Sequence, residues 1–309
     1  TSTSANNFFF TYTSFIQPTT LYLSNGDGKI TEVKRMPAMF DATGLEVEQM
    51  AATSKDGTKV PFFVVHRRGI PRDGNSPTLL YAYGGFEVSQ TPGYSSTVGA
   101  AWLERGGVYV MANIRGGGEF GPQWHRAGLK EHRQRVFDDF TAVSEELVRQ
   151  KITSPTRLGI MGGSNGGLLV GVAFTQRPEL YGAVVVQVPL LDMRRYNHLL
   201  AGASWMAEYG DPDKPEEWAY IAKYSPYQNL EARRTYPTVM FTTTTRDDRV
   251  HPGHARKMAA KMESLGKPFY YFENTEGGHG AGVTNEQRAK MMALTYAYLW
   301  KQLGSALTP

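Results

Sequence analysis

The chain has 309 residues, of which 41% are hydrophobic and 12% aromatic, and this is enough material for one large core. It contains no cysteine, which excludes disulfides, thiol catalysis and cysteine metal sites. The 33 basic and 29 acidic residues are well mixed and give a net charge of +4, so no basic stripe favours nucleic acid. No apolar run approaches the ~18 residues that span a bilayer. No basic residue precedes Lys29, so no secretory signal is indicated. We expect a soluble protein of the cytoplasm or the periplasm, with no membrane or nucleic-acid partner.

The first 45 residues differ from the rest of the chain. They are rich in aromatic and β-branched residues and contain a turn signal at Asn25-Gly26-Asp27-Gly28. This pattern predicts two or three strands, which are too few to fold alone. We therefore divide the chain into a short N-terminal β segment, 1–45, and a main domain, 46–309.

The main domain begins with a second hairpin, after which short apolar strands alternate with helical stretches. Residues 138–150 and 254–266 carry apolar side chains at helical spacing. Apolar strands that alternate with helices predict an α/β fold, with a mostly parallel sheet covered by helices on both faces. The expected strands are 47–54 and 59–68 for the hairpin, then 78–83, 108–113, 157–162, 183–188, 238–245 and 269–274.

One serine lies among glycines in the stretch "GIMGGSNGGLLVG" (159–171). Gly162-Gly163-Ser164-Asn165-Gly166 fits the pattern G-x-S-x-G between an expected strand and an expected helix, which is the context of a nucleophile elbow. In such a turn the flanking residues are glycines because strand and helix backbones approach too closely for side chains. The alternative is a glycine-rich turn whose serine only caps the helix.

The elbow predicts where its two partners should be found. In this fold an acid and then a histidine follow the serine, each after a late strand. Asp247 and Asp248 follow the strand 238–245, and His279 follows the strand 269–274 within a glycine-rich loop. These positions are at the carboxyl ends of strands, where ligands bind in open α/β sheets. We expect Ser164 to be the nucleophile, His279 the base and Asp247 the acid that orients it.

An acyl transfer of this kind also needs two donors for the oxyanion. One is expected to be the backbone N–H of Asn165, directly after the nucleophile. The other is expected from the loop after the strand 78–83, which reads Tyr83-Gly84-Gly85-Phe86. Together these features indicate a serine hydrolase that works through an acyl-enzyme.

Two other patterns are weighed and set aside. "GGGEFG" (116–121) matches the dinucleotide pattern G-x-G-x-x-G, but Arg115 precedes it and no clear helix is expected to start at its third glycine. His251 and His254 lie near the two aspartates and suggest a metal site. We favour a helix start with solvated histidines there.

Eight motifs, in order, resemble the catalytic domain of prolyl oligopeptidase from about residue 46 to the C-terminus. The resemblance implies an α/β-hydrolase fold and a serine peptidase that cuts short peptides after proline without metal or cofactor. The motifs are "YAYGGFEVSQTPGYS", "ANIRGGGEFGPQWHRAG", "FDDF", "SPTRLGIMGGSNGGLLV", "YGDP", "KYSPYQNL", "RDDRVHPGHARKM" and "GGHGAG".

The resemblance also implies roles for further residues. It matches Ser164, Asp247 and His279 to the triad and Tyr83 to an oxyanion hydroxyl, since a phenol with a pKa near ~10 keeps its proton at neutral pH. It matches Trp205 to an indole that stacks on the substrate proline, where the residues alone favour a core aromatic. The remaining implied contacts are Arg249, which grips the peptide carbonyl before the proline, and Phe86, Leu190, Tyr209 and Val250, which wall the proline pocket.

The first 45 residues are where the chain departs from the resemblance. Members of the family carry a β-propeller ahead of the catalytic domain, and residues 1–45 look like its last strands and linker. An exposed apolar strand edge pairs readily with another chain, so we expect a homodimer through this segment. Without a lid, a carboxylesterase acting on small esters stays open as an alternative, as does a binding module that has lost activity.

Overall fold

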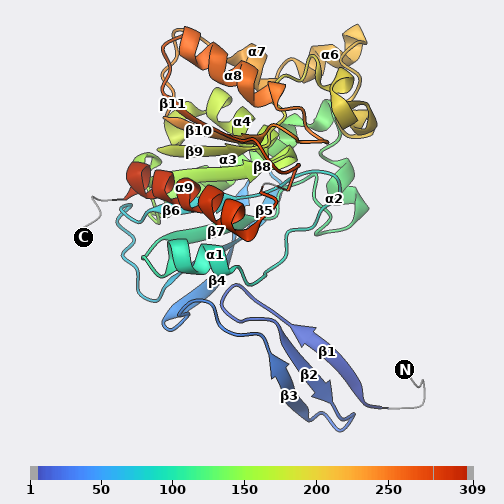
Figure 1. Cartoon of the computed structure of the whole chain (residues 1–309). Helices are drawn as coiled ribbons and strands as arrows, with labels where there is room; N and C mark the ends of the chain where they lie inside the picture. The colour runs from blue at the N-terminus through green and yellow to red at the C-terminus, as the bar shows by residue number, and fades with distance from the viewer. Residues whose placement is uncertain (1–5, 281, 305–309) are drawn as a thin grey trace.

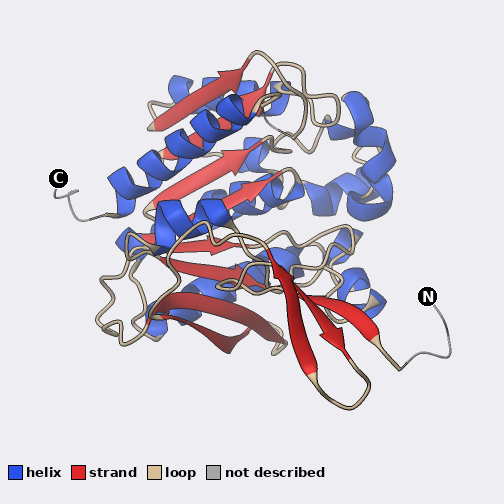
Figure 2. Ribbon diagram, turned by 60° about the horizontal axis from the view of Figure 1, so that its bottom comes forward, coloured by secondary structure: helices blue, strands red, loops and turns tan. Residues whose placement is uncertain are grey.

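The computed structural model describes residues 6–280 and 282–304, and these form two separate sheets (Figure 1). The smaller sheet is antiparallel and has the order β1-β2-β3, and Figures 1 and 2 show it projecting from the rest of the molecule. The larger sheet has eight strands in the order β11-β10-β9-β8-β6-β7-β5-β4. The strands of the smaller sheet are β1 (Phe8–Tyr12), β2 (Thr20–Ser24) and β3 (Ile30–Arg35).

The large sheet is mostly parallel. The strands β6 to β11 run parallel to one another, and the hairpin β4–β5 joins β7 through antiparallel pairing. This confirms the predicted α/β class, and each expected strand is found with its ends shifted by only one or two residues. The strands are β4 (Leu45–Thr53), β5 (Lys59–Arg67), β6 (Thr78–Tyr81), β7 (Val108–Ala112), β8 (Leu158–Gly163), β9 (Ala183–Gln187), β10 (Val239–Thr244) and β11 (Phe269–Asn274).

Helices connect the parallel strands. The two expected helices are present as α3 and α8, and a long C-terminal helix, α9, is added to them. The α-helices are α1 (Ser96–Val98), α2 (Pro122–Arg126), α3 (Gln134–Arg149), α4 (Asn165–Gln176), α5 (Met206–Tyr209), α6 (Pro215–Ile221), α7 (Pro226–Asn229), α8 (Gly253–Ser264) and α9 (Asn285–Leu303).

Successive side chains of the central strands pack in two different hydrophobic cores, one on each face of the sheet. Leu79 and Val185 belong to a cluster that contains Leu299 of α9, whereas their neighbours Leu80 and Val184 pack in the cluster that contains residues of α3, α4 and α8. Because strand side chains alternate between faces, this division means that helices cover both faces of the sheet. Figure 1 shows α9 on one side of the sheet, and among the described residues no helix is long and apolar enough to cross a membrane.

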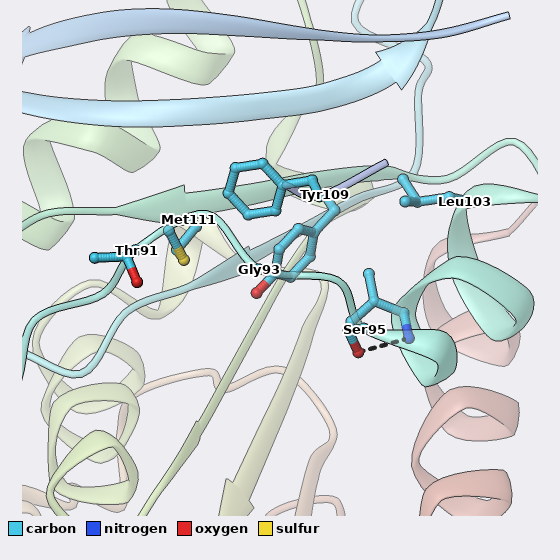
Figure 3. A pocket seen from close by; sticks show the side chains of 8 residues that line it. Thr91, Gly93, Ser95, Leu103, Tyr109 and Met111 are labelled. Atoms are coloured by element: carbon cyan, nitrogen blue, oxygen red, sulfur yellow. Dashed lines mark hydrogen bonds between the residues drawn. The ribbon is translucent and has the colours of Figure 1, made fainter. Parts of the chain in front are cut away.

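The loop after β1 attaches the small sheet to the main body. Phe15 is buried, and its ring lies 5.6 Å from that of Phe63 and 6.2 Å from that of Tyr109. A cavity of about 90 Å³ lies beside this contact, with Thr91, Gly93 and Met111 along its wall (Figure 3).

Ser95 also lines this cavity, but its hydroxyl accepts a hydrogen bond of 3.2 Å from the N–H of Val98 at the start of α1 (Figure 3). The hydroxyl is thus engaged as a helix cap. None of the described residues that line the cavity is a histidine or an acid. It is a packing junction, and the candidate catalytic groups lie at the carboxyl ends of the strands.

Candidate active site

Ser164 occupies the turn between β8 and α4 in a strained conformation. Its φ of 57° is rare for a residue with a side chain, and such strain persists only where the surrounding structure enforces it. The serine stands at the N-cap position of α4, yet its side chain makes no capping hydrogen bond. The capping interpretation is therefore not supported, because the hydroxyl is not engaged by the N-terminus of α4.

The glycines around Ser164 differ in how strictly the turn needs them. A Cβ on Gly162 would lie 2.1 Å from the carbonyl oxygen of Gly166, and a Cβ on Gly167 would lie 2.8 Å from that of Gln187. Both contacts are impossible for real side chains, so strand and helix do approach as expected. Gly163 departs from the expectation, because a Cβ there would meet nothing closer than 3.7 Å.

Asp247 and His279 meet after the neighbouring strands β10 and β11. Nδ1 of His279 lies 2.8 Å from Oδ2 of Asp247, whose side chain is fully buried. The other carboxylate oxygen of Asp247 accepts the backbone N–H groups of Arg249 and Val250, each at 2.9 Å. The adjacent Asp248 is exposed, so the structure brings only Asp247 of the pair to the histidine.

The loop that carries His279 is held by a few polar contacts. Thr244 donates its hydroxyl to the carbonyl of Gly278 at 2.9 Å, and Gly277 has a φ of 93° that favours glycine. Gly280, by contrast, has open space around it. Within residues 6–280 and 282–304, no hydrogen bond joins His279 to Ser164, and catalytic hydrogen bonds are often long or poorly aligned in proteins without a bound substrate.

Ser164 opens into a pocket of about 380 Å³. Six of the residues matched by the resemblance line this pocket together with the serine, and Val88 and Ser204 join them although the sequence did not single them out. Two other predicted residues are buried. Val250 donates its backbone N–H to Asp247, and Asn165 follows Ser164 in the turn. The predicted residues in the pocket wall are Tyr83, Phe86, Leu190, Trp205, Tyr209 and Arg249.

Tyr83 is suited to donate a hydrogen bond inside this pocket. Burial raises the pKa of its phenol above the ordinary value, and a hydrogen-bonding interaction with Ser164 opposes this rise only in part. The phenol therefore keeps its proton at neutral pH. Its backbone carbonyl is fixed from below, because Nδ2 of Asn165 donates to it at 2.6 Å.

Sequence reasoning missed a buried polar network under the pocket. Arg133 and Glu208 form an ion pair of 2.8 Å and are both almost fully buried. Arg133 also donates to the side chain of Asn165, and Glu208 contacts Nε2 of His125 at 2.8 Å. In the sequence Arg133 stands in the charged run "KEHRQR", which looks like a solvated surface.

The patterns set aside in the sequence have structural roles. Gly116 and Gly118 allow close backbone approach, since a Cβ on either would lie within 2.5 Å of the carbonyl of Gly84 or Glu87. A helix does begin after the third glycine, contrary to expectation, but α2 has only five residues.

His254 is not solvated as expected. It is buried, burial lowers its pKa to about 4, and its Nδ1 accepts N–H groups of Leu191 and Asp192. A backbone-bonded neutral imidazole of this kind is a packing element. Among the described residues, one group has the spacing of metal ligands, and it consists of Glu46, Glu48 and His66. Neither His251 nor His254 belongs to it.

Comparison with known proteins agrees with this arrangement. The model of the Prolyl oligopeptidase family (Peptidase_S9) matches residues 94–306. An uncharacterized peptidase of Sinorhizobium fredii is 55% identical over 290 residues, which cover 94% of this chain and 40% of that protein. A prolyl endopeptidase of Elizabethkingia miricola is 41% identical over 284 residues, which cover 90% of this chain and 40% of that protein.

A solved structure extends the comparison to the fold. The post-proline cleaving enzyme from Rickettsia typhi superimposes with a TM-score of 0.92 at 45% identity, over 96% of this chain and 43% of that one. The chain thus spans about 40% of the length of the relatives that it matches. It has the α/β-hydrolase fold, and it belongs to the prolyl oligopeptidase family.

Proposed function

We propose that this chain hydrolyses short peptides after proline, through an acyl-enzyme formed on Ser164. The observation that carries the proposal is the strained, uncapped serine, which shares one pocket with Tyr83, Trp205 and Arg249. The Asp247–His279 pair stands at the ends of β10 and β11, two adjacent strands at one edge of the sheet, in the chain order that the fold requires.

The chemistry follows from the hydrogen bonds of the acid and the base. The buried carboxylate of Asp247 accepts from Nδ1 of His279, which leaves Nε2 without a proton and able to take the one from Ser164. The serine oxygen then attacks the substrate carbonyl, and the imidazolium protonates the leaving amine. Water hydrolyses the acyl-enzyme by the same route in reverse.

Two donors stabilise the negative oxygen that develops in this reaction. The N–H of Asn165 is at the start of α4, where the helix dipole also favours negative charge. The hydroxyl of Tyr83 approaches from the loop after β6. Losing one such donor typically costs ~10²–10³ in kcat.

The walls of the pocket support proline as the residue before the cut bond. Phe86 and Tyr209 meet edge to face with ring centroids 5.6 Å apart, and Trp205 adds a third aromatic surface. A compact apolar ring fits between such surfaces, whereas a long polar side chain would be desolvated there. Arg249 at the rim supplies charged donors for a peptide carbonyl.

Turnover of two substrates by the full chain tests the proposal. We expect hydrolysis of a blocked Gly-Pro arylamide to exceed that of the matching Gly-Ala arylamide by about two- to tenfold from aromatic stacking alone. A nitrophenyl acetate ester serves as a third substrate. Hydrolysis of the ester without cleavage of either arylamide would contradict the proposal and favour a carboxylesterase.

We also propose that the β1–β3 sheet mediates association with a second copy of the chain. Phe8, Phe9, Ile30 and Val33 are all at least half exposed on this sheet, and both β1 and β3 are edge strands. Exposed apolar edges favour pairing. Light scattering is expected to give a dimer for the chain and a monomer for Phe9→Lys, and a monomer for both would refute the idea.

A further inference from the structure

The buried ion pair between Arg133 and Glu208 is not explained by stability. Arg133 precedes α3 and is 1% exposed, and Glu208 lies in α5 and is 4% exposed. Removing two charges from water often costs more free energy than their mutual attraction recovers. Replacing such an ion pair by apolar residues of similar size can leave the stability of the protein unchanged. Nε of Arg133 also lacks a hydrogen-bond partner among the described residues. The pair is therefore expected to do something other than stabilise the core.

The arginine end of the pair holds the elbow. Nη2 of Arg133 donates to Oδ1 of Asn165, the residue whose N–H is the proposed oxyanion donor. The same Oδ1 accepts the hydroxyl of Tyr209 at 2.7 Å, and the guanidinium carbon lies 5.0 Å from the centre of the Tyr209 ring. These contacts fix the Asn165 amide so that its Nδ2 reaches the carbonyl of Tyr83 at 2.6 Å.

The glutamate end of the pair holds the opposite loop. Oε1 of Glu208, which Arg133 binds, also accepts the backbone N–H of Phe86 at 2.9 Å. Phe86 and Glu87 both have a φ of 57°, which is strained for residues with side chains. A fully buried carboxylate on the Phe86 N–H is a contact that holds this strained loop in place. One ion pair thus spans both loops that supply oxyanion donors.

We infer that Arg133 and Glu208 are positioning residues that set the distance between the oxyanion hydroxyl of Tyr83 and Ser164. This inference rests on the proposed serine peptidase function. Neither Arg133 nor Glu208 is among the described residues that line the substrate pocket. The pair acts on the pocket through Asn165 and the loop 83–86. Oxyanion donors work only when they lie 2.7–3.1 Å from the developing charge, so a displacement of ~1 Å is enough to lose most of their effect.

Arg133→Lys is the first test. Lysine keeps the positive charge beside Glu208 but lacks the planar fork that reaches Glu208 and Asn165 together. We expect kcat for the Gly-Pro arylamide to fall by up to about 10²-fold with KM nearly unchanged, because the loss is confined to the transition state. A rise in KM with kcat retained would overturn the inference.

A double-mutant cycle with Tyr83→Phe separates positioning from simple destabilisation. If Arg133 acts through Tyr83, removing the hydroxyl will cost much less in the Arg133→Lys background than in the native chain. Equal costs in both backgrounds would overturn the inference. Should Arg133→Lys fail to fold, Glu208→Gln takes its place in the same cycle, with the same expected non-additivity and the same contrary result.

Arg115→Lys is the matched control. Arg115 forms a buried ion pair of 2.6 Å with Asp139, but this pair connects to Asp56 instead of the pocket. We expect its melting temperature to fall while kcat stays within about twofold of the native value, as for a purely structural pair. A kcat loss equal to that of Arg133→Lys would remove the distinction on which the inference depends.

Labelling with a fluorophosphonate keeps the inference separate from the proposed function. A native chain that neither reacts with the probe nor turns over the arylamide would mean that the serine peptidase function is wrong. If the native chain reacts with the probe and cleaves the arylamide, but the effects of Arg133→Lys and Tyr83→Phe are additive, the proposed function is retained and the positioning role is wrong.

Discussion

The two loops that carry the serine and the histidine are built in opposite ways. The elbow is buried from Asn165 onward, is sterically restricted to glycine at Gly162 and is tied to other loops through the Asn165 side chain. The histidine loop is partly exposed from Gly277 to His279 and has open space at Gly280. One loop is fixed by the core, and the other is held by a few polar contacts.

This difference matches what each loop has to do. Groups that stabilise a developing charge are most effective when they are fixed before the reaction begins. His279, as the proposed general base, would instead move a proton between the serine and the leaving group, and its ring contacts one buried carboxylate, Asp247. Segments with few buried contacts open at low free-energy cost, so the histidine side is the side that can adjust.

Asp247→Asn should produce the largest loss of activity in this set. An amide in place of the carboxylate favours the wrong tautomer of His279, and a change of this kind lowers kcat by about 10⁴-fold. Asp248→Asn should have little effect, since Asp248 is exposed and makes no such contact. Steady-state kinetics of both variants would decide, and equal losses would mean that Asp247 does not orient the base alone.

Tyr83→Phe should lower kcat by about 10²–10³-fold, because it removes one oxyanion donor from the rigid side. Burial holds the pKa of Tyr83 above its ordinary value of 10, so the phenol is mainly protonated below that pH. The native chain and the variant should therefore share the same pH profile of kcat below pH 10. A difference in shape within that range would show that the phenol titrates earlier.

Gly162→Ala and Gly280→Ala compare the two loops most directly. A methyl group on Gly162 would lie 2.1 Å from a backbone oxygen, so the elbow must shift, at a cost of about 1–3 kcal/mol in unfolding free energy. No described atom lies within 4 Å of a Cβ on Gly280, and its alanine variant should stay within about 0.5 kcal/mol of the native chain. Urea titration measures both, and a reversed order would break the comparison.

Trp205→Ala should give the smallest loss of activity among the variants of proposed site residues, and the loss should depend on the substrate. Stacking of an aromatic ring is worth about 0.5–1.5 kcal/mol beyond buried area, so cleavage of the proline arylamide should fall by roughly tenfold. Hydrolysis of a small acetate ester, which has no proline ring, should change much less. An equal loss on both substrates would mark Trp205 as a core residue.

The sequence predicted most of the fold and the strand ends at which the candidate site residues lie, and the reasons are local. Apolar runs such as 238–245 and 269–274 mark buried strands, and chemistry follows where those strands end, so Asp247 and His279 could be located. The strained turn at Ser164 has its own signature, because only glycine tolerates the close approach at Gly162.

The contacts that the sequence did not predict depend on tertiary burial. Arg133 and Glu208 are residue types that usually lie at the surface, and the sequence around them does not indicate that both are buried. His254 was misread for the same reason, since its two backbone partners come from a distant loop. The need for glycine at Gly163 was also inferred from the motif and is not supported by the space around it.

The most direct test of the account is to map the residue that a fluorophosphonate modifies in the full chain. We expect one adduct per chain, on the peptide that contains Ser164, and no adduct on Ser164→Ala. Blocked Gly-Pro peptide should slow the labelling by competing for the same pocket. Labelling at a different residue, or an unlabelled chain that still cleaves the arylamide, would contradict the assignment of Ser164 as the nucleophile.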